Sequence, residues 1–124
     1  MIDFQSDSIF KLKPIDHDDI REDCHHFLVD GETVVGAFKT VRDQVVFTNK
    51  RVIAANVKGL TGSKVDYTSI PYSKIQAYSV ETSGTFDMDC EIELHVSQLG
   101  LVKFEISGSF DLVTFNKHIS EHIL

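Results

Sequence analysis

The stretch that decides the fold is RDQVVFTNKRVIAANV, residues 42–57. Two runs rich in β-branched and aromatic residues are divided by Asn49-Lys50, a turn-forming pair. Two such runs around a two-residue break predict a β-hairpin. The charged pairs Arg42-Asp43 and Lys50-Arg51 then stand at its ends. They either form a charged site or are only the solvated rim of the hairpin.

A two-residue hydrophobic period continues on both sides of this hairpin. Breaks such as KGLTGS and SQLG separate the runs, and connections this short force antiparallel neighbours. We predict seven strands, at residues 33–41, 44–48, 51–57, 64–69, 74–82, 87–96 and 101–107. The sixth alternates most clearly, with Asp87, Asp89, Glu91, Glu93 and His95 on one face and Met88, Cys90, Ile92, Leu94 and Val96 on the other.

Helical spacing occurs before and after the strands. Residues 14–29 predict a short helix with Asp16 as its N-cap, ended by Asp30-Gly31-Glu32. After Gly108 a second helix is expected, with Ser109 as N-cap and Asp111 in its first turn. Its apolar stripe, which should face the sheet, consists of Leu112, Phe115, Ile119 and Ile123.

These elements predict a mainly β fold. About seven antiparallel strands are enough to form a sandwich or a partly open barrel, and the C-terminal helix closes it. At 124 residues the chain is expected to be one structural domain.

Charge is concentrated near the N-terminus. Residues 1–32 carry nine acidic and three basic residues, while the rest carries ten acidic and nine basic ones. No concentrated basic footprint exists, which argues against nucleic acid and anionic membranes as partners. No secretory leader pattern or apolar span is visible, so a cytoplasmic protein is expected. Cys24 and Cys90 are then expected to be reduced, packed thiols.

Two patterns raise the question of a metal. HISEH, residues 118–122, fits the H-x-x-E-H zinc signature, but the site needs a third ligand and both histidines border the apolar stripe of the helix. Asp89 and the other carboxylates of the sixth strand could share a calcium ion, but no glycine-containing ligand loop accompanies them. We expect no metal and no cofactor, and keep a metal enzyme using His118 and His122 as a third alternative.

Several motifs appear in a fixed order. Gly31-Glu32 precedes the first strand, and the segments RD, FTNKR, GLTGSK, SIPYSKI and SVETSGTFDMDCE follow. They begin at residues 42, 47, 59, 69 and 79. In the residues of these motifs and in their order, the chain resembles the bacterial pleckstrin-homology-like (bacterial PH domain) family of single-domain proteins.

The resemblance implies a PH-like fold of two packed antiparallel sheets capped by the C-terminal helix. Residues 1–32 would form an acidic segment with a short helix, and residues 33–124 the PH-like domain. The resemblance also implies cyclic, dome-like homo-oligomers, with a pentamer as a candidate. Their polar surface would bind an unidentified protein partner. No catalytic activity is implied.

The expected protein-interaction surface consists of polar residues at strand ends: Arg42, Asp43, Lys50, Arg51, Glu81 and Asp87. The second alternative is a binder of a small anionic ligand or lipid head group through Lys50, Arg51, Lys58 and Lys64. Lipid binding at the first hairpin turn is disfavoured, because that turn offers one cation, Arg42, beside one anion, Asp43.

Overall fold

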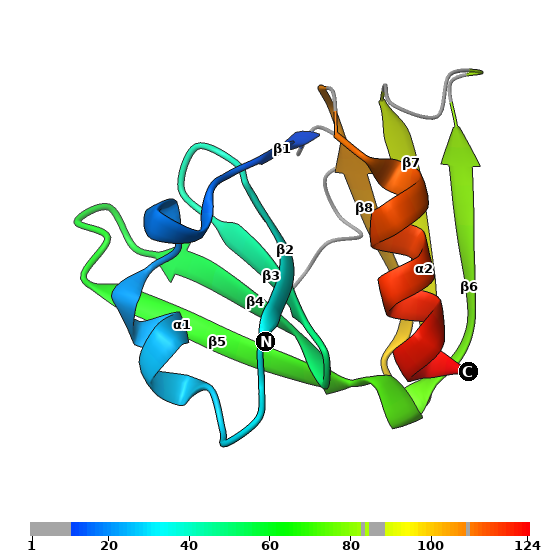
Figure 1. The fold of residues 1–124 in the computed structure, drawn as a ribbon. Coiled ribbons are helices and arrows are strands. Elements are labelled where there is room, and N and C mark those ends of the chain that lie inside the picture. The colour runs from blue at the N-terminus through cyan, green and yellow to red at the C-terminus, as the bar shows by residue number, and fades with distance from the viewer. Residues whose placement is uncertain (1–10, 83, 85–88, 109) are drawn as a thin grey trace.

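The computed structural model describes residues 11–82, 84, 89–108 and 110–124 (Figure 1). Its strands and helices follow in this order: β1 (Lys11–Pro14), η1 (His17–Asp19), α1 (Glu22–Phe27), β2 (Val34–Lys39), β3 (Gln44–Thr48), β4 (Arg51–Lys58), β5 (Lys64–Pro71), η2 (Tyr72–Lys74), β6 (Ile75–Thr82), β7 (Cys90–Val96), β8 (Gly100–Ile106) and α2 (Leu112–Ile123). The mainly β order with a closing C-terminal helix is confirmed.

The strands form one sheet in the order β5-β4-β3-β2-β1-β8-β7-β6. The expected division into two separate sheets is therefore wrong. The strand that joins the halves is β1, which pairs antiparallel with β2 and parallel with β8. Sequence reasoning missed β1 because it has four residues and ends at Pro14.

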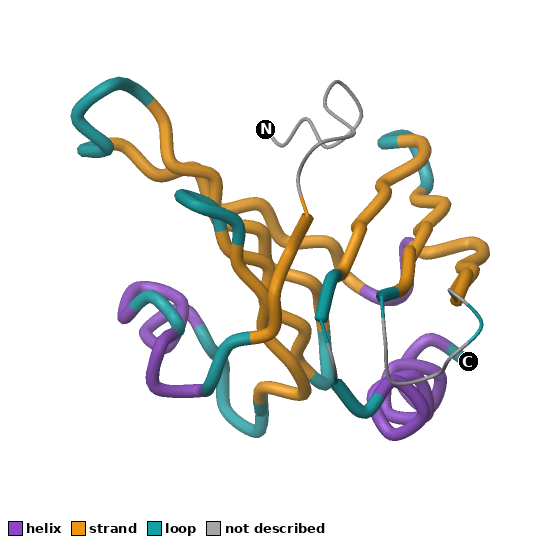
Figure 2. The backbone as a smooth tube through the Cα atoms, turned by 90° about the horizontal axis from the view of Figure 1, so that it is seen from above, coloured by secondary structure: helices purple, strands orange, loops and turns teal. Residues whose placement is uncertain are grey.

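The half of the sheet made of β2–β5 is buried on both faces. Val45 and Phe47 of β3 pack into the main core, which also takes the inner faces of β6–β8 and of α2. Val46, between them, packs into a second core with Ile20 and Cys24 of the N-terminal segment. Figure 2 shows α1 against this half and α2 beside the other half.

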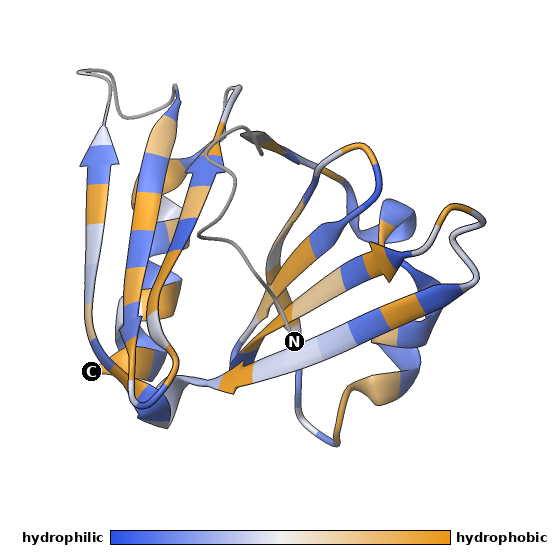
Figure 3. Cartoon of the chain, turned by 180° about the vertical axis from the view of Figure 1, so that it is seen from behind, coloured by the Kyte–Doolittle hydropathy of each residue, from blue (hydrophilic) through white to orange (hydrophobic). Residues whose placement is uncertain are grey.

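The half made of β6–β8 is buried on one face. Cys90, Ile92, Leu94 and Val96 are buried, while His95 is exposed, which gives β7 the alternating stripes of Figure 3. The alternation predicted for this strand is confirmed over the described residues. Its predicted beginning at Asp87, with Met88, lies outside them.

The predicted helix over residues 14–29 is wrong in extent. The chain is extended at Ile20 (ψ 139°), so two short helices, η1 and α1, replace one long one. Asp16 precedes η1, and its side chain makes no capping hydrogen bond. Packing of Ile20 and Cys24 against the sheet decides the path here and overrides helical periodicity.

Helix α2 begins with Asp111 as its N-cap, one of whose carboxylate oxygens accepts a hydrogen bond from Thr114 N at 3.1 Å. The predicted N-cap, Ser109, lies outside the described residues. The predicted stripe is confirmed, since Leu112, Phe115 and Ile119 are buried. Among the helices that the structure describes, none is long and apolar enough to span a membrane.

Candidate functional site

A buried carboxylate lies beside the β3–β4 hairpin. The side chain of Glu32 is 0% exposed, and Arg51, at the start of β4, contacts it with two nitrogens: Nε lies 2.9 Å from Oε2 and Nη2 2.9 Å from Oε1. This forked geometry is the strong form of an ion pair. The remaining Arg51 nitrogen, Nη1, donates to Ser69 Oγ at 3.1 Å. The charge of Arg51 is thus satisfied within the chain.

Thr48 and Tyr72 complete this group of side chains. Thr48 Oγ1 donates to Glu32 Oε2 at 2.6 Å and accepts from the backbone nitrogens of Lys50 and Arg51, both at 3.0 Å. The buried Tyr72 hydroxyl donates to the carbonyl oxygen of Thr48 at 2.5 Å. We call Glu32, Thr48, Arg51 and Tyr72 the Glu32 cluster.

The pKa values of this cluster follow from its contacts. Burial alone would raise the pKa of Glu32, but hydrogen bonds from Arg51, Thr48 and the Val29 nitrogen outweigh it and hold the pKa below its ordinary value. Burial, and then the Glu32 charge, raise the pKa of Tyr72 well above its usual range. Glu32 is therefore ionised and Tyr72 neutral at physiological pH.

Three of the sequence motifs meet at this cluster. Gly31-Glu32 supplies the carboxylate, the FTNKR segment supplies Thr48 and Arg51, and the SIPY segment supplies Tyr72. The side chain of Asn49 links the hairpin turn to the segment before β2. It accepts a hydrogen bond from Thr33 N at 2.9 Å and donates one to the Gly31 carbonyl at 3.0 Å. From the sequence, Glu32 was interpreted only as part of the segment that ends the first helix. The pattern that could have indicated the ion pair is an acidic residue just before a strand, followed by an arginine in the next hairpin.

The Arg42-Asp43 end of the β2–β3 turn is also held by internal bonds. Asp43 Oδ1 accepts from Val57 N at 2.8 Å, and Arg42 Nη2 donates to the Gly59 carbonyl. The RD segment therefore fixes the β4–β5 loop, where Gly59 and Gly62 both have positive φ angles (79° and 68°). The Arg42 side chain remains exposed.

Glu81 lies at the other half of the sheet, at the end of the edge strand β6. It stands opposite Glu91, whose carboxylate is 3.1 Å from Lys103 Nζ. A shallow hollow of about 220 Å³ lies here, lined by Glu81, Thr82, Asp89, Cys90, Glu91, Glu105, Ile106 and Ser107. We call these residues the acidic corner. Asp87, expected to belong to the surface, lies outside the described residues.

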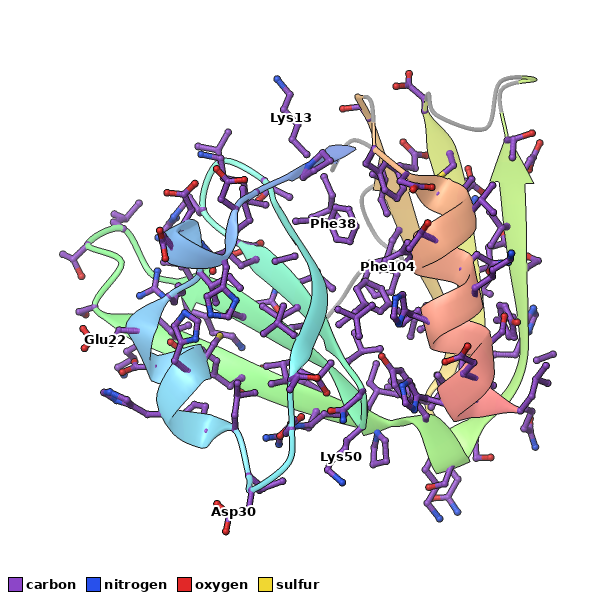
Figure 4. The ribbon with its side chains drawn as sticks, viewed as in Figure 1. Lys13, Glu22, Asp30, Phe38, Lys50 and Phe104 are labelled. Atoms are coloured by element: carbon purple, nitrogen blue, oxygen red, sulfur yellow. The ribbon has the colours of Figure 1, made fainter. Side chains whose placement is uncertain are left out.

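The structure does not gather the expected surface residues into one patch. Lys50 and Arg51 lie at one end of the β3–β4 hairpin (Lys50 is labelled in Figure 4), Arg42 and Asp43 at the other, and Glu81 on the other half of the sheet. The alternative set is also divided. Lys58 and Lys64 are cross-strand partners, but Lys58 lies seven positions along β4 from Arg51, or about 23 Å away.

The two histidines of HISEH lie on the exposed side of α2. His118 is exposed, and His122 stacks on Tyr72 with ring centroids 6.4 Å apart. Within the described ranges, no three His, Cys, Asp or Glu side chains are grouped closely enough to hold a metal ion. Cys24 and Cys90 are both free and buried, as expected.

A comparison with known protein families finds a family model that covers almost the whole chain. The model of the bacterial PH domain matches residues 3–123. The chain belongs to the bacterial PH domain family. Among solved structures, it is similar to a DUF1696 family protein with a pleckstrin-homology domain from Shewanella loihica PV-4, at 36% identity and a TM-score of 0.75, over 93% of this chain and 99% of the other.

Two further proteins illustrate the family. A pleckstrin homology domain from Shewanella amazonensis SB2B is 43% identical with a TM-score of 0.59, over 82% of this chain and 83% of the other. The uncharacterized protein YjqA of Bacillus subtilis (strain 168) is 47% identical over 78 residues, which are 63% of this chain and 62% of that protein's length. The match to YjqA thus spans less than two thirds of that relative.

Proposed function

We propose that this bacterial PH domain is a non-enzymatic interaction module that assembles into a cyclic homo-oligomer and presents a polar surface to a protein partner. The observation that carries the proposal is the state of the sheet edges. Strands β5 and β6 are the two ends of the strand order, each has eight residues, and neither outer edge is paired with another described strand.

Long uncovered edges are a hazard that proteins normally remove by covering, charging or pairing them. Here the edge strand β6 carries one charged residue, Glu81, and no proline. Pairing with other copies of the chain would cover the outer sides of these two strands. A contact between two different edges that closes on itself gives a cyclic assembly.

The polar residues that remain exposed, Arg42, Lys50 and Glu81, would then be repeated around the ring as the partner-binding surface. Asp43 and Arg51 support this surface by fixing the loops beside it. Repetition raises the affinity for a partner with several contact points through effective concentration. PH domains are generally non-catalytic modules, which agrees with this role.

Light scattering coupled to size exclusion at low micromolar protein is expected to give several times the 14.0 kDa mass of the chain. The mass should stay constant on tenfold dilution if the ring is closed. A mass near that of one chain, unchanged on tenfold concentration, would exclude the assembly.

The alternative, binding of a lipid head group, predicts a different result. With its lysines divided between two ends of β4, the protein should not co-sediment with phosphatidylserine or phosphoinositide vesicles, even at low salt where electrostatic attraction is strongest. Lys58→Ala/Lys64→Ala and Lys50→Ala test each end separately. Saturable binding at micromolar lipid that either variant abolishes would favour the lipid reading.

A further inference from the structure

Residues 15–29, which contain η1 and α1, lie as a separate layer across the outer face of β2–β5 (Figure 1). We call these residues the strap. The second core lies beneath it and consists of Ile20, Cys24, Ala37, Val46, Ile53 and Ala55. The strap contributes the buried side chains of Ile20 and Cys24, and the sheet contributes the other four. Among the described residues, the second core shares none with the main core.

We propose that the strap, held closed by Tyr67, opens as a unit while the sheet and the main core stay folded. The open state exposes the apolar outer face of β2–β5, so the strap is a cover that decides when this face can be reached. Opening of the strap does not depend on the assembly of copies into a ring.

The strap has little stability of its own. Its two helices have three and six residues, and isolated helices shorter than about 12 residues are marginal in water. Arg21, the residue before α1, makes no side-chain capping hydrogen bond. Both helices therefore persist because Ile20 and Cys24 pack on the sheet, and losing this packing should release the strap as one cooperative unit.

Tyr67 of β5 holds the middle of the strap. Its hydroxyl accepts a hydrogen bond from Arg21 Nε at 3.2 Å and donates one to Asp23 Oδ2 at 3.1 Å, and its ring meets that of Phe27 edge to face. Asp23 and Phe27 are exposed, so water can replace these contacts at a small net cost. Gln44 of β3 exchanges two further hydrogen bonds with strap backbone groups, at 2.9 and 3.0 Å.

Both ends of the strap are fixed to the sheet. At its start, Ile15 N donates to the Ala37 carbonyl at 3.0 Å, directly after the pairing of β1 with β2. At its end, Arg51 Nη2 donates to the Phe27 carbonyl at 2.7 Å, and Arg51 is itself held by the buried Glu32. The strap therefore opens between two anchors instead of detaching from the molecule.

The face that opening exposes is apolar. Val46, Ile53 and Ala55 are each 1% exposed in the closed state, and Val65 packs beside them. Exposed apolar surfaces of this kind bind other molecules or aggregate. Closure keeps the face out of reach, and the contacts of Tyr67 set how often it is reached.

Thiol alkylation measures the opening, because Cys24 lies in the second core. Val45 is the matched position, since it lies in the main core on the opposite face of β3 from Val46. In the Val45→Cys variant, iodoacetamide labelling of both thiols can be followed in the same molecules by peptide mass spectrometry. Cys24 is expected to react at least about a hundredfold faster, because it needs only the opening of the strap. Equal rates at the two positions would overturn the proposal.

The urea dependence of labelling separates local opening from global unfolding. Labelling of Cys24 should rise weakly with urea, because opening of the strap exposes much less surface than global unfolding does. The native chain suffices here, with its equilibrium denaturation as the comparison, so the test stands even if Val45→Cys does not fold. A urea slope for Cys24 equal to that of global unfolding would show one cooperative unit and contradict the proposal.

Tyr67→Phe tests what holds the strap closed, because it removes the hydroxyl and keeps the ring that meets Phe27. Labelling of Cys24 is expected to rise roughly three- to tenfold, the effect of about one net hydrogen bond, and labelling at position 45 to stay unchanged. Tyr78→Phe is the control, because the Tyr78 hydroxyl bonds to Ser120 of α2, and it should leave Cys24 unchanged. No rise at Cys24 in Tyr67→Phe, or an equal rise at both thiols, would overturn the proposal.

Discussion

Arg51→Ala is expected to lower the free energy of unfolding by about 3 kcal/mol, because it leaves the carboxylate of Glu32 buried without its partner. The Glu32 side chain is fully inaccessible, and Arg51 supplies two of the hydrogen bonds that satisfy it. Since Thr48 and the Val29 nitrogen still contact Glu32, the loss should be near the lower end of the range for broken buried pairs. Urea denaturation at equal protein concentrations measures it.

The matched control is Arg42→Ala. Arg42 is also an arginine at a hairpin end, but it is exposed and its side chain donates to a loop carbonyl, that of Gly59. We expect a much smaller loss there. The Glu32→Leu/Arg51→Met double variant should recover most of the stability lost in Arg51→Ala, since it removes both charges together. Equal losses in Arg51→Ala and Arg42→Ala would contradict the role given to the Glu32 cluster.

The same pair predicts a dependence on pH. The pKa of Glu32 is lower in the folded protein than in the unfolded chain, so its contribution to stability is fully present above the unfolded value, about 4.3. It is lost as pH falls from that value through the folded pKa. Glu32→Gln should remove this part of the acid destabilisation, and an unchanged acid slope in Glu32→Gln would show that Glu32 does not titrate as described.

Most of the strands could be predicted from the sequence, although β1 could not. Residues 44–48 were predicted with their observed bounds, because Asn49-Lys50 and Arg42-Asp43 are strong local breaks. The N-terminal segment could not be predicted in the same way. Its helical spacing is real, but burial of Ile20 and Cys24 against β3 and β4 is a tertiary effect that local pattern does not contain.

The charged residues show the same limit. Their positions at strand ends followed from the sequence, and Asp43 and Arg51 form hydrogen bonds within the chain there. The sequence did not show which side chains pair, because Glu32 and Arg51 are 19 positions apart and are brought together by the tertiary fold. The function of the exposed charges stays a prediction.

Phe47→Ala is expected to lower the free energy of unfolding by about 4 kcal/mol. Phe47 is 1% exposed, and its ring meets those of Phe38, Phe104 and Phe115 edge to face, with centroids 5.9, 5.7 and 5.0 Å away. Phe38 and Phe104, labelled in Figure 4, come from the two halves of the sheet.

Phe47 therefore joins three layers: the β2–β5 half, the β6–β8 half and α2. Removing its ring leaves a cavity that these layers cannot close, since each is fixed by its own hydrogen bonds. Phe27→Ala is the matched control, because Phe27 is 47% exposed and its ring meets that of Tyr67 edge to face. Denaturation should show a loss several times larger for Phe47→Ala.

If Phe47→Ala does not fold, Phe47→Leu supplies the measurement, with an expected loss of about 1–2 kcal/mol. A typical domain has only about 5–15 kcal/mol of stability in total. Because assembly stabilises the folded state by mass action, all variants must be compared at one protein concentration. A smaller loss for Phe47→Leu than for Phe27→Ala would mean that the halves are held together mainly by β1 and its backbone pairing, and not by the aromatic core.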